Sequence, residues 1–195
     1  DNLVEANFSD IGDFDGDGVS DLAEYTNGSD PTTDDYVSQW ATVQTTAGSQ
    51  WQTVTLTDSH VSPVVIAGVP TALETSPGVV RIKDVGHNGF SVKFQEWEHY
   101  DGTHSAEDIG LLVVPAGHST LADGTVVEAG TLSVNGTKSW TTHTFTSSFP
   151  GSPSLFLTVQ SENGTEVVAI RASDVTSAGF ELALFEQEAS TNQHV

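Results

Sequence analysis

The chain contains no cysteine and no methionine. Without cysteine it forms no disulfides and no thiolate metal sites, and thiols give no indication of the redox compartment. Because methionine is absent even at position 1, a chain that begins at Asp1 is expected to be processed, cut from a longer protein or only partly resolved. No run of about 18 apolar residues occurs, so the sequence predicts no membrane-spanning helix.

Positive charge is scarce. Five Lys and Arg stand against 27 Asp and Glu, which gives a formal net charge of −22 with His neutral. A polyanion such as nucleic acid would be repelled by this chain, so we expect no nucleic-acid partner. The acidic excess suits a saline setting or a chain that binds calcium.

The part of the chain after residue 36 is dominated by short runs rich in β-branched and aromatic residues. Gly, Pro, Asn or Asp bound each run, as is typical of antiparallel strands. The predicted strands lie within residues 50–58, 63–70, 79–85, 89–99, 109–117, 140–148, 154–161, 166–174 and 179–188. Before residue 36 the chain is polar and acidic, with one short helical pattern at residues 20–25. The pattern predicts an all-β protein built from β-sandwiches.

Four dipeptides between these runs predict tight turns, because Asn, Asp and Gly tolerate the positive φ that such turns require. They are Asn88-Gly89, Asp123-Gly124, Asn135-Gly136 and Asn163-Gly164.

An internal repeat relates the two halves of the β region. The stretch "RIKDVGHNGFSVKFQEWE" from Arg81 matches "RASDVTSAGFELALFEQE" from Arg171, an offset of 90 residues. The sequence therefore predicts two tandem units, at residues 37–134 and 135–195, after a polar segment at 1–36. The second unit is expected to be incomplete, so that a continuing chain or another chain completes it.

The stretch "DFDGDGVSDLAE" has the spacing of a calcium-binding loop. Alternating carboxylates converge on a hard cation, and Gly18 permits the sharp turn between them. The predicted calcium ligands are Asp13, Asp15, Asp17, the backbone carbonyl of Val19, Asp21 and Glu24.

The wider stretch "DFDGDGVSDLAEYTNGSDPTTDD" resembles a bacterial thrombospondin type 3 repeat over residues 10–35. In that family the repeats are extracellular calcium-binding spacers between domains. The resemblance implies secretion and a structural role for Ca²⁺.

The β units resemble the H-type lectin superfamily of six-stranded antiparallel sandwiches. The resemblance covers residues 40–195 and rests on "W-x-T-V-T-L…P-V-V" from Trp51, on "D-V-x-x-x-G-F-x-V" from Asp84, and on its echo from Asp174. It implies sugar binding and oligomeric assembly, with no sugar-binding residue matched individually.

A loop rich in aromatic and polar residues follows the strand predicted at 89–99. Aromatic rings there can stack on a sugar, while polar groups bond its hydroxyls. The candidate ligand-binding residues are Trp97, His99, Tyr100, Asp101, His104 and Glu107. Alternatively, Trp97 is a core-facing strand residue, since it alternates with Glu96 and Glu98, and the second copy has Gln187 in its place.

Two further site chemistries have less support in the sequence. A transition-metal site would use His87, His99, His104 and His118, whose spacing matches no zinc pattern. A glycosidase pair would use Glu96 with Glu98, or either of them with Glu107, and requires a carboxylate separation that sequence does not give.

The leading hypothesis is an extracellular, non-catalytic carbohydrate-binding or adhesion region stabilised by Ca²⁺. The alternative is a structural subunit of an extracellular filament or surface layer, assembled by strand exchange. The expected partners are therefore a glycan or neighbouring protein subunits, with a homo-oligomer as one form of the latter.

Overall fold

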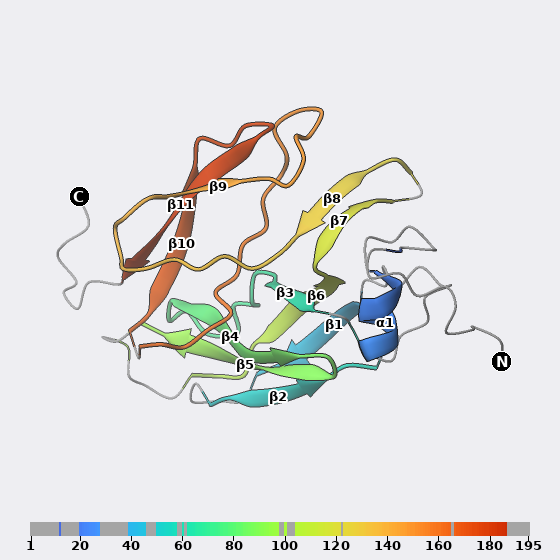
Figure 1. Ribbon diagram of the computed structural model, residues 1–195. Coiled ribbons are helices and arrows are strands. Elements are labelled where there is room, and N and C mark those ends of the chain that lie inside the picture. The colour runs from blue at the N-terminus through green and yellow to red at the C-terminus, as the bar shows by residue number, and fades with distance from the viewer. Residues whose placement is uncertain are drawn as a thin grey trace.

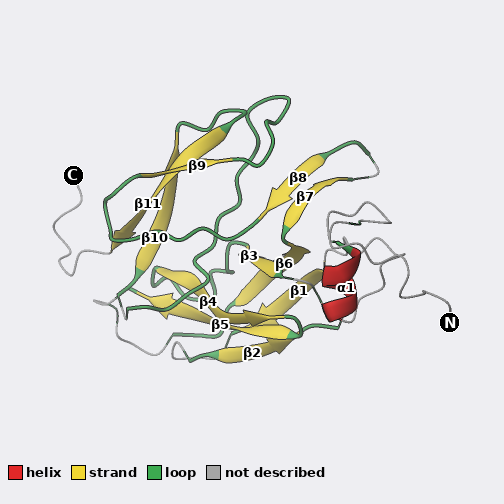
Figure 2. Ribbon diagram, in the orientation of Figure 1, coloured by secondary structure: helices red, strands yellow, loops and turns green. Residues whose placement is uncertain are grey.

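The computed structural model describes residues 12, 20–27, 39–45, 50–57, 60, 62–97, 100, 104–121, 123–164 and 166–186. Within them the chain forms eleven strands, all paired antiparallel, and one short helix (Figures 1 and 2). The predicted all-β fold class is confirmed.

The short helical pattern in the acidic segment is also confirmed. It forms α1, Asp21–Asn27. The backbone N–H of Asp21 donates to the carbonyl oxygen of Gly12 at 2.8 Å. The Thr26 hydroxyl donates to the carbonyl oxygen of Leu22 at 2.7 Å, within the helix.

The first unit is a sandwich of two three-stranded sheets. One sheet has the order β1-β6-β3, with β1 at Gln39–Gln44, β3 at Pro63–Ala67 and β6 at Asp108–Pro115. The other has the order β2-β5-β4, with β2 at Gln52–Thr55, β4 at Gly78–Gly86 and β5 at Gly89–Glu96. The six-stranded architecture that the lectin resemblance implies is present in this unit.

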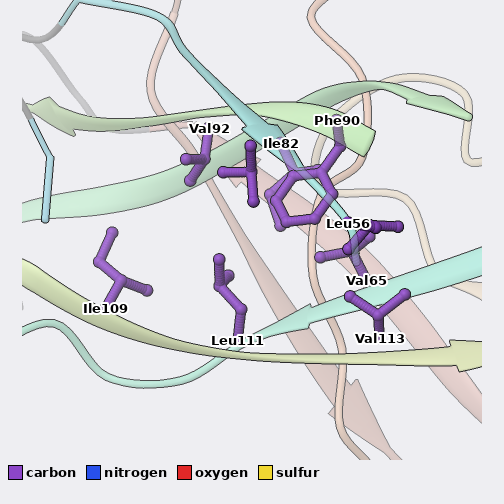
Figure 3. Packing of buried hydrophobic residues seen from close by; sticks show 9 residues of the cluster. Leu56, Val65, Ile82, Phe90, Val92, Ile109, Leu111 and Val113 are labelled. Atoms are coloured by element: carbon purple, nitrogen blue, oxygen red, sulfur yellow. The ribbon is translucent and has the colours of Figure 1, made fainter. Parts of the chain in front are cut away.

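The core lies between these two sheets. In Figure 3, Ile82, Phe90 and Val92 point from one sheet toward Ile109 and Leu111 of the other, and all five are buried. Successive side chains of a strand point to opposite faces, so Arg81, Lys83 and Lys93 lie on the outer face of the β2-β5-β4 sheet. The apolar residues thus form the core, and the outer face carries the charges.

A hairpin follows the first sandwich. It pairs β7 (Gly117–Thr120) with β8 (Val126–Ala129). Gly124 has φ 85° in the turn, as Asp123-Gly124 predicts, and the Thr125 N–H donates to the Asp123 carboxylate at 2.9 Å. The carboxylate of Glu128 on β8 accepts bonds from Thr146 N–H at 3.0 and 3.1 Å, which joins the hairpin to the second unit.

The second unit repeats one sheet of the first. The order β9-β11-β10 corresponds to β2-β5-β4, with β9 at Thr141–Thr144, β10 at Val168–Ser173 and β11 at Gly179–Glu186. The register is the same, since Gly89 pairs with Thr55 and Gly179 with Thr144.

Backbone details support the repeat. Asp84 and Asp174 both have positive φ, 53° and 49°. The hydrogen bond from Leu56 N–H to the Asn88 carbonyl recurs as one from Phe145 N–H to the Ala178 carbonyl, at 2.9 and 3.0 Å. The sequence repeat is therefore also a repeat of the chain path.

Some local predictions were wrong. Residues 154–161 form no strand, whereas β1, β7 and β8 were not predicted. The turn between β4 and β5 consists of His87 and Asn88, and the positive φ is found earlier, at Asp84, where the pairing shifts register. In the part of the chain described here, no second sheet pairs across the core face of β9-β11-β10.

Candidate functional site

The predicted ligand loop is only partly a surface. His99 and Asp101 lie outside the described residues. Trp97 is half-buried at the end of β5, and its carbonyl oxygen accepts a bond from Tyr100 N–H at 2.8 Å. Tyr100 is exposed, whereas His104 and Glu107 are only 2% and 1% exposed. Trp97 and Tyr100 therefore remain candidates for contact with a ligand, and the buried pair is directed inward.

Glu107 anchors the loop before β4. Its carboxylate accepts bonds from the Thr71 hydroxyl at 2.5 Å, from Leu73 N–H at 3.1 and 3.2 Å and from Glu74 N–H at 3.2 Å. Burial alone would raise the pKa of Glu107, but these hydrogen bonds outweigh it and hold the pKa below its ordinary value. Such a fully bonded buried carboxylate stabilises the fold.

His104 completes the inward-facing group. Its Nδ1 lies 2.5 Å from the Ser105 carbonyl oxygen and its Nε2 lies 3.8 Å from Glu107 Oε1. Its ring also packs on Phe94, with centroids 4.4 Å apart. The two residues act as packing and positioning groups below the loop.

Most of the predicted calcium loop lies outside the described residues, namely Asp13, Asp15, Asp17 and Val19. Glu24 lies in α1, and nothing is described of its side chain. Asp21 is buried at the start of α1, and its backbone N–H bonds to the carbonyl oxygen of Gly12, which directly precedes the predicted loop.

Elsewhere among the described residues, no three potential ligands of the His, Cys, Asp or Glu type gather to hold a metal. This applies to His87, His104 and His118, three of the four histidines considered for a transition metal. The Nδ1 atom of His87 instead lies 2.7 Å from the His60 carbonyl oxygen.

A second cluster of charged and polar side chains was not predicted from sequence. Glu162, on the segment between β9 and β10, reaches the outer face of the first unit. Its carboxylate lies 2.7 Å from Lys93 Nζ and 3.3 Å from Lys83 Nζ, and it accepts a bond from the Trp51 indole N–H at 3.1 Å. Both ammonium groups also lie over the Trp51 ring, 4.3 and 4.6 Å from its centroid, so they are held from two sides.

Arg81 extends this contact along the same segment. Its guanidinium donates to the carbonyl oxygens of Ser161 at 3.1 Å and Glu166 at 3.0 Å, and to the Gln95 side chain at 3.3 Å. Burial lowers the pKa of Arg81, whereas the charge of Glu162 opposes that effect. We call the contact of Arg81, Lys83, Lys93 and Trp51 with residues 158–164 and 166 the repeat joint.

The joint also covers one edge strand of each sheet of the sandwich, β4 and β3. Ile82 N–H on β4 donates to the Val159 carbonyl oxygen at 3.3 Å. On β3, Val65 N–H donates to the Gln160 side chain and Ala67 N–H to the Thr158 hydroxyl, each at 3.0 Å. In Figure 1 this orange segment returns to the first unit beside β4 before it enters β10. Uncovered strand edges invite pairing with other chains, and the joint closes two of them.

A sequence signal for the joint does exist. The chain has five Lys and Arg in all, and three of them alternate along predicted strands with the apolar positions of the core. A cluster of cations on one face of such an acidic chain indicates an acidic partner segment. It does not indicate which acid of the 27 meets it.

Comparison with known proteins gives one partial relative. The chain is 32% identical to Halomucin of Haloquadratum walsbyi over 155 residues, which cover 75% of this chain and 2% of Halomucin. The chain thus spans about 2% of the length of that relative. The similarity covers so small a part of Halomucin that it shows no specific function for this chain.

No protein-family model and no solved structure matches the chain. The resemblances to thrombospondin type 3 repeats and to H-type lectins are therefore not supported by these comparisons.

Among the described residues, no helix is both long and apolar enough to span a membrane.

Proposed function

We propose that this chain is a non-catalytic structural region of an extracellular surface protein, in which tandem β units are locked side by side. The repeat joint carries this proposal. It fixes the segment that leads into β10 onto the preceding unit through Glu162, Lys83 and Lys93. A chain of independent units on flexible linkers would need no such contact.

The charge distribution favours the same function. With a net charge of −22, two neighbouring units repel each other at most points of contact. Three of the five cations lie where the units meet. Because Lys93 and Glu162 are largely withdrawn from solvent, salt screens their attraction less than it screens the repulsion between exposed acids. The joint is thus suited to a saline medium.

Hydrogen exchange of single amides tests the proposal. The amide of Ile82 is bonded to Val159, whereas Ala172, its counterpart on β10, is exposed at the same register position. We expect the Ile82 amide to exchange at least about a hundredfold more slowly than that of Ala172. Equal rates at Ile82 and Ala172 would show that the joint does not hold the units together, and would overturn the proposal.

Recognition of a glycan is the second candidate function. Tyr100 is 43% exposed next to half-buried Trp97, an arrangement in which an aromatic ring can stack on a sugar face. A glycan array with wild type and Tyr100→Ala tests it, with Tyr25→Ala on α1 as the matched control because Tyr25 is also exposed. Loss of a signal only in Tyr100→Ala would support recognition. If wild type bound no glycan on the array, recognition of the glycans tested would be excluded.

Ca²⁺ would act as a structural clamp in either function. The carboxylates predicted from the sequence would hold it, and Asp21 at the start of α1 joins them to the described structure. Bound there, the ion would neutralise several carboxylates of the acidic segment before the first strand.

A further inference from the structure

The outer face of the second sheet carries an exposed aromatic cluster. Trp140 is 46% exposed, its ring centroid lies 6.0 Å from that of Phe185, and the Arg171 guanidinium lies 5.6 Å from the Phe185 centroid. These residues occupy the positions of Trp51, Gln95 and Arg81 in the first unit. The first-unit face is covered by residues 158–164 and 166. On the second sheet Trp140 and Arg171 are exposed, whereas Ala183, the counterpart of Lys93, is buried. We call the cluster of Trp140, Arg171 and Phe185 the receptor.

A matching ligand segment is exposed on the first unit. At the 90-residue offset, residues 68–76 correspond to residues 158–166. In this loop Val69 is 91% exposed and Leu73 is 64% exposed, although both are apolar. Glu107 accepts hydrogen bonds from the backbone of Leu73 and Glu74. These bonds fix the backbone of the loop that carries the two exposed apolar side chains.

The receptor on the second sheet and the loop at residues 68–76 both differ from their counterparts in the repeat joint. In the joint, charged residues of one partner face opposite charges of the other, whereas the receptor and the loop both lack these charges. In the joint Glu162 meets Lys83 and Lys93. In the second case Ala72 stands in place of Glu162, Ser173 in place of Lys83 and the buried Ala183 in place of Lys93. Likewise the polar residues Gln95 and Asn163 are replaced by Phe185 and Leu73. Arg171 is retained, and in the joint its counterpart Arg81 binds backbone carbonyls, which any sequence supplies.

We propose that a second copy of this chain binds here head to tail, with its 68–76 loop placed over Trp140, Arg171 and Phe185 of the first copy. This rests on the proposed structural function and names the partner. Because loop and receptor are different surfaces, the contact is heterologous, and copies joined by it form a ring if the rotation between them closes and an open filament if it does not. The proposed assembly is the open filament, which leaves one loop and one receptor free at its ends. It is held by apolar contact, where the repeat joint is held by charge.

Two complementary variants test the contact. Leu73→Asp disrupts the apolar surface of the loop and leaves the receptor intact. Trp140→Ala disrupts the receptor and leaves the loop intact. We expect wild type to form a concentration-dependent series of oligomers in sedimentation velocity at high salt, and each variant alone to associate at least about tenfold more weakly. An equimolar mixture should form a heterodimer and nothing larger, since each copy then has one working surface.

Trp40→Ala is the matched control, because Trp40 is 75% exposed on β1, away from this face. It should assemble like wild type, and the thermal midpoints of all variants should agree within a few degrees. A wild type that remains monomeric up to about millimolar concentration, or a mixture of the two variants that remains monomeric, overturns the proposal. If Trp140 instead responds to a glycan and not to a second copy, the face is a sugar site and the proposal is also overturned. The repeat joint is judged separately, by exchange of the Ile82 amide.

Discussion

The carboxylate of Glu162 lies 2.7 Å from the ammonium group of Lys93, although 69 residues separate them in the chain. Lys93 belongs to the first repeat and Glu162 to the second, so this pair joins the two. Lys83 and the Trp51 indole approach the same carboxylate, so one side chain carries much of the polar contact between the units.

Neutralising Glu162 should weaken the fold. Glu162→Gln leaves Lys93 largely buried without a charged partner, and we expect a loss of about 2 kcal/mol in the free energy of unfolding. This corresponds to a thermal midpoint lower by roughly 4–8 °C in a chain of this size. Glu166→Gln is the matched control, because Glu166 is exposed and contributes its backbone carbonyl to Arg81. Equal midpoints for the two variants would contradict a stabilising role of Glu162.

Acid should act through the same residue. Hydrogen bonds from Lys93 and Lys83 hold the pKa of Glu162 below its ordinary value, against the opposing effect of burial. Because the pKa is lower in the folded state, the stabilisation is fully present above the unfolded value of about 4.3 and is lost as the pH falls through the folded value. Urea midpoints at pH 6 and pH 3 should differ more for wild type than for Glu162→Gln. The same difference in both proteins would show that this carboxylate does not contribute.

Two glycines should be equally intolerant of alanine. A Cβ atom at Gly89 would overlap the Val54 carbonyl oxygen, and one at Gly179 would overlap that of His143, the corresponding residue of the second unit. We expect Gly89→Ala and Gly179→Ala each to lower the free energy of unfolding by about 3 kcal/mol in urea titrations.

Gly110→Ala is the comparison for both glycines, since nothing lies within 4 Å of its Cβ position. Gly110→Ala should lower the free energy of unfolding much less than either of the other two substitutions. If Gly179→Ala were as mild as Gly110→Ala, the second sheet would not hold its strands at the spacing of the first.

Calcium should bind at the acidic loop. Isothermal titration is expected to show about one ion per chain with a dissociation constant on the order of 10⁻⁴ M, as in extracellular modules. Asp17→Asn removes one predicted ligand and should abolish the heat. Asp35→Asn changes the same charge outside the loop pattern and should leave the heat unchanged. Binding that survives Asp17→Asn would place the ion elsewhere.

The strands were largely predictable because their apolar residues recur every second position. Eight of the nine predicted runs overlap a strand. The exception, 154–161, has the composition of a strand, yet its backbone and polar side chains bond to β3 and β4 as a single covering segment. Composition indicates an extended chain, but only tertiary contact decides whether it is paired in a ladder.

The candidate sites were less predictable, since sequence does not distinguish an exposed polar residue from a buried one that is fully bonded. Tyr100 and Glu107 both lie near the same predicted loop, and one is at the surface while the other accepts hydrogen bonds in the interior. Glu162 illustrates the opposite error. A single acid just after a predicted strand gives no sign of the three groups, 69 to 111 residues away, that bond to it.

The pairing of β1 with β6 determines how the first unit responds to tension. Gln39, where the chain enters the sandwich, lies opposite Val113, close to where the chain leaves it. A force that pulls on both ends is therefore applied at one end of this strand pair and peels it apart one residue pair at a time, from Gln39 toward Gln44. Stretching a surface protein made of such units would extend it at low force, and each unit could reclose as the load fell.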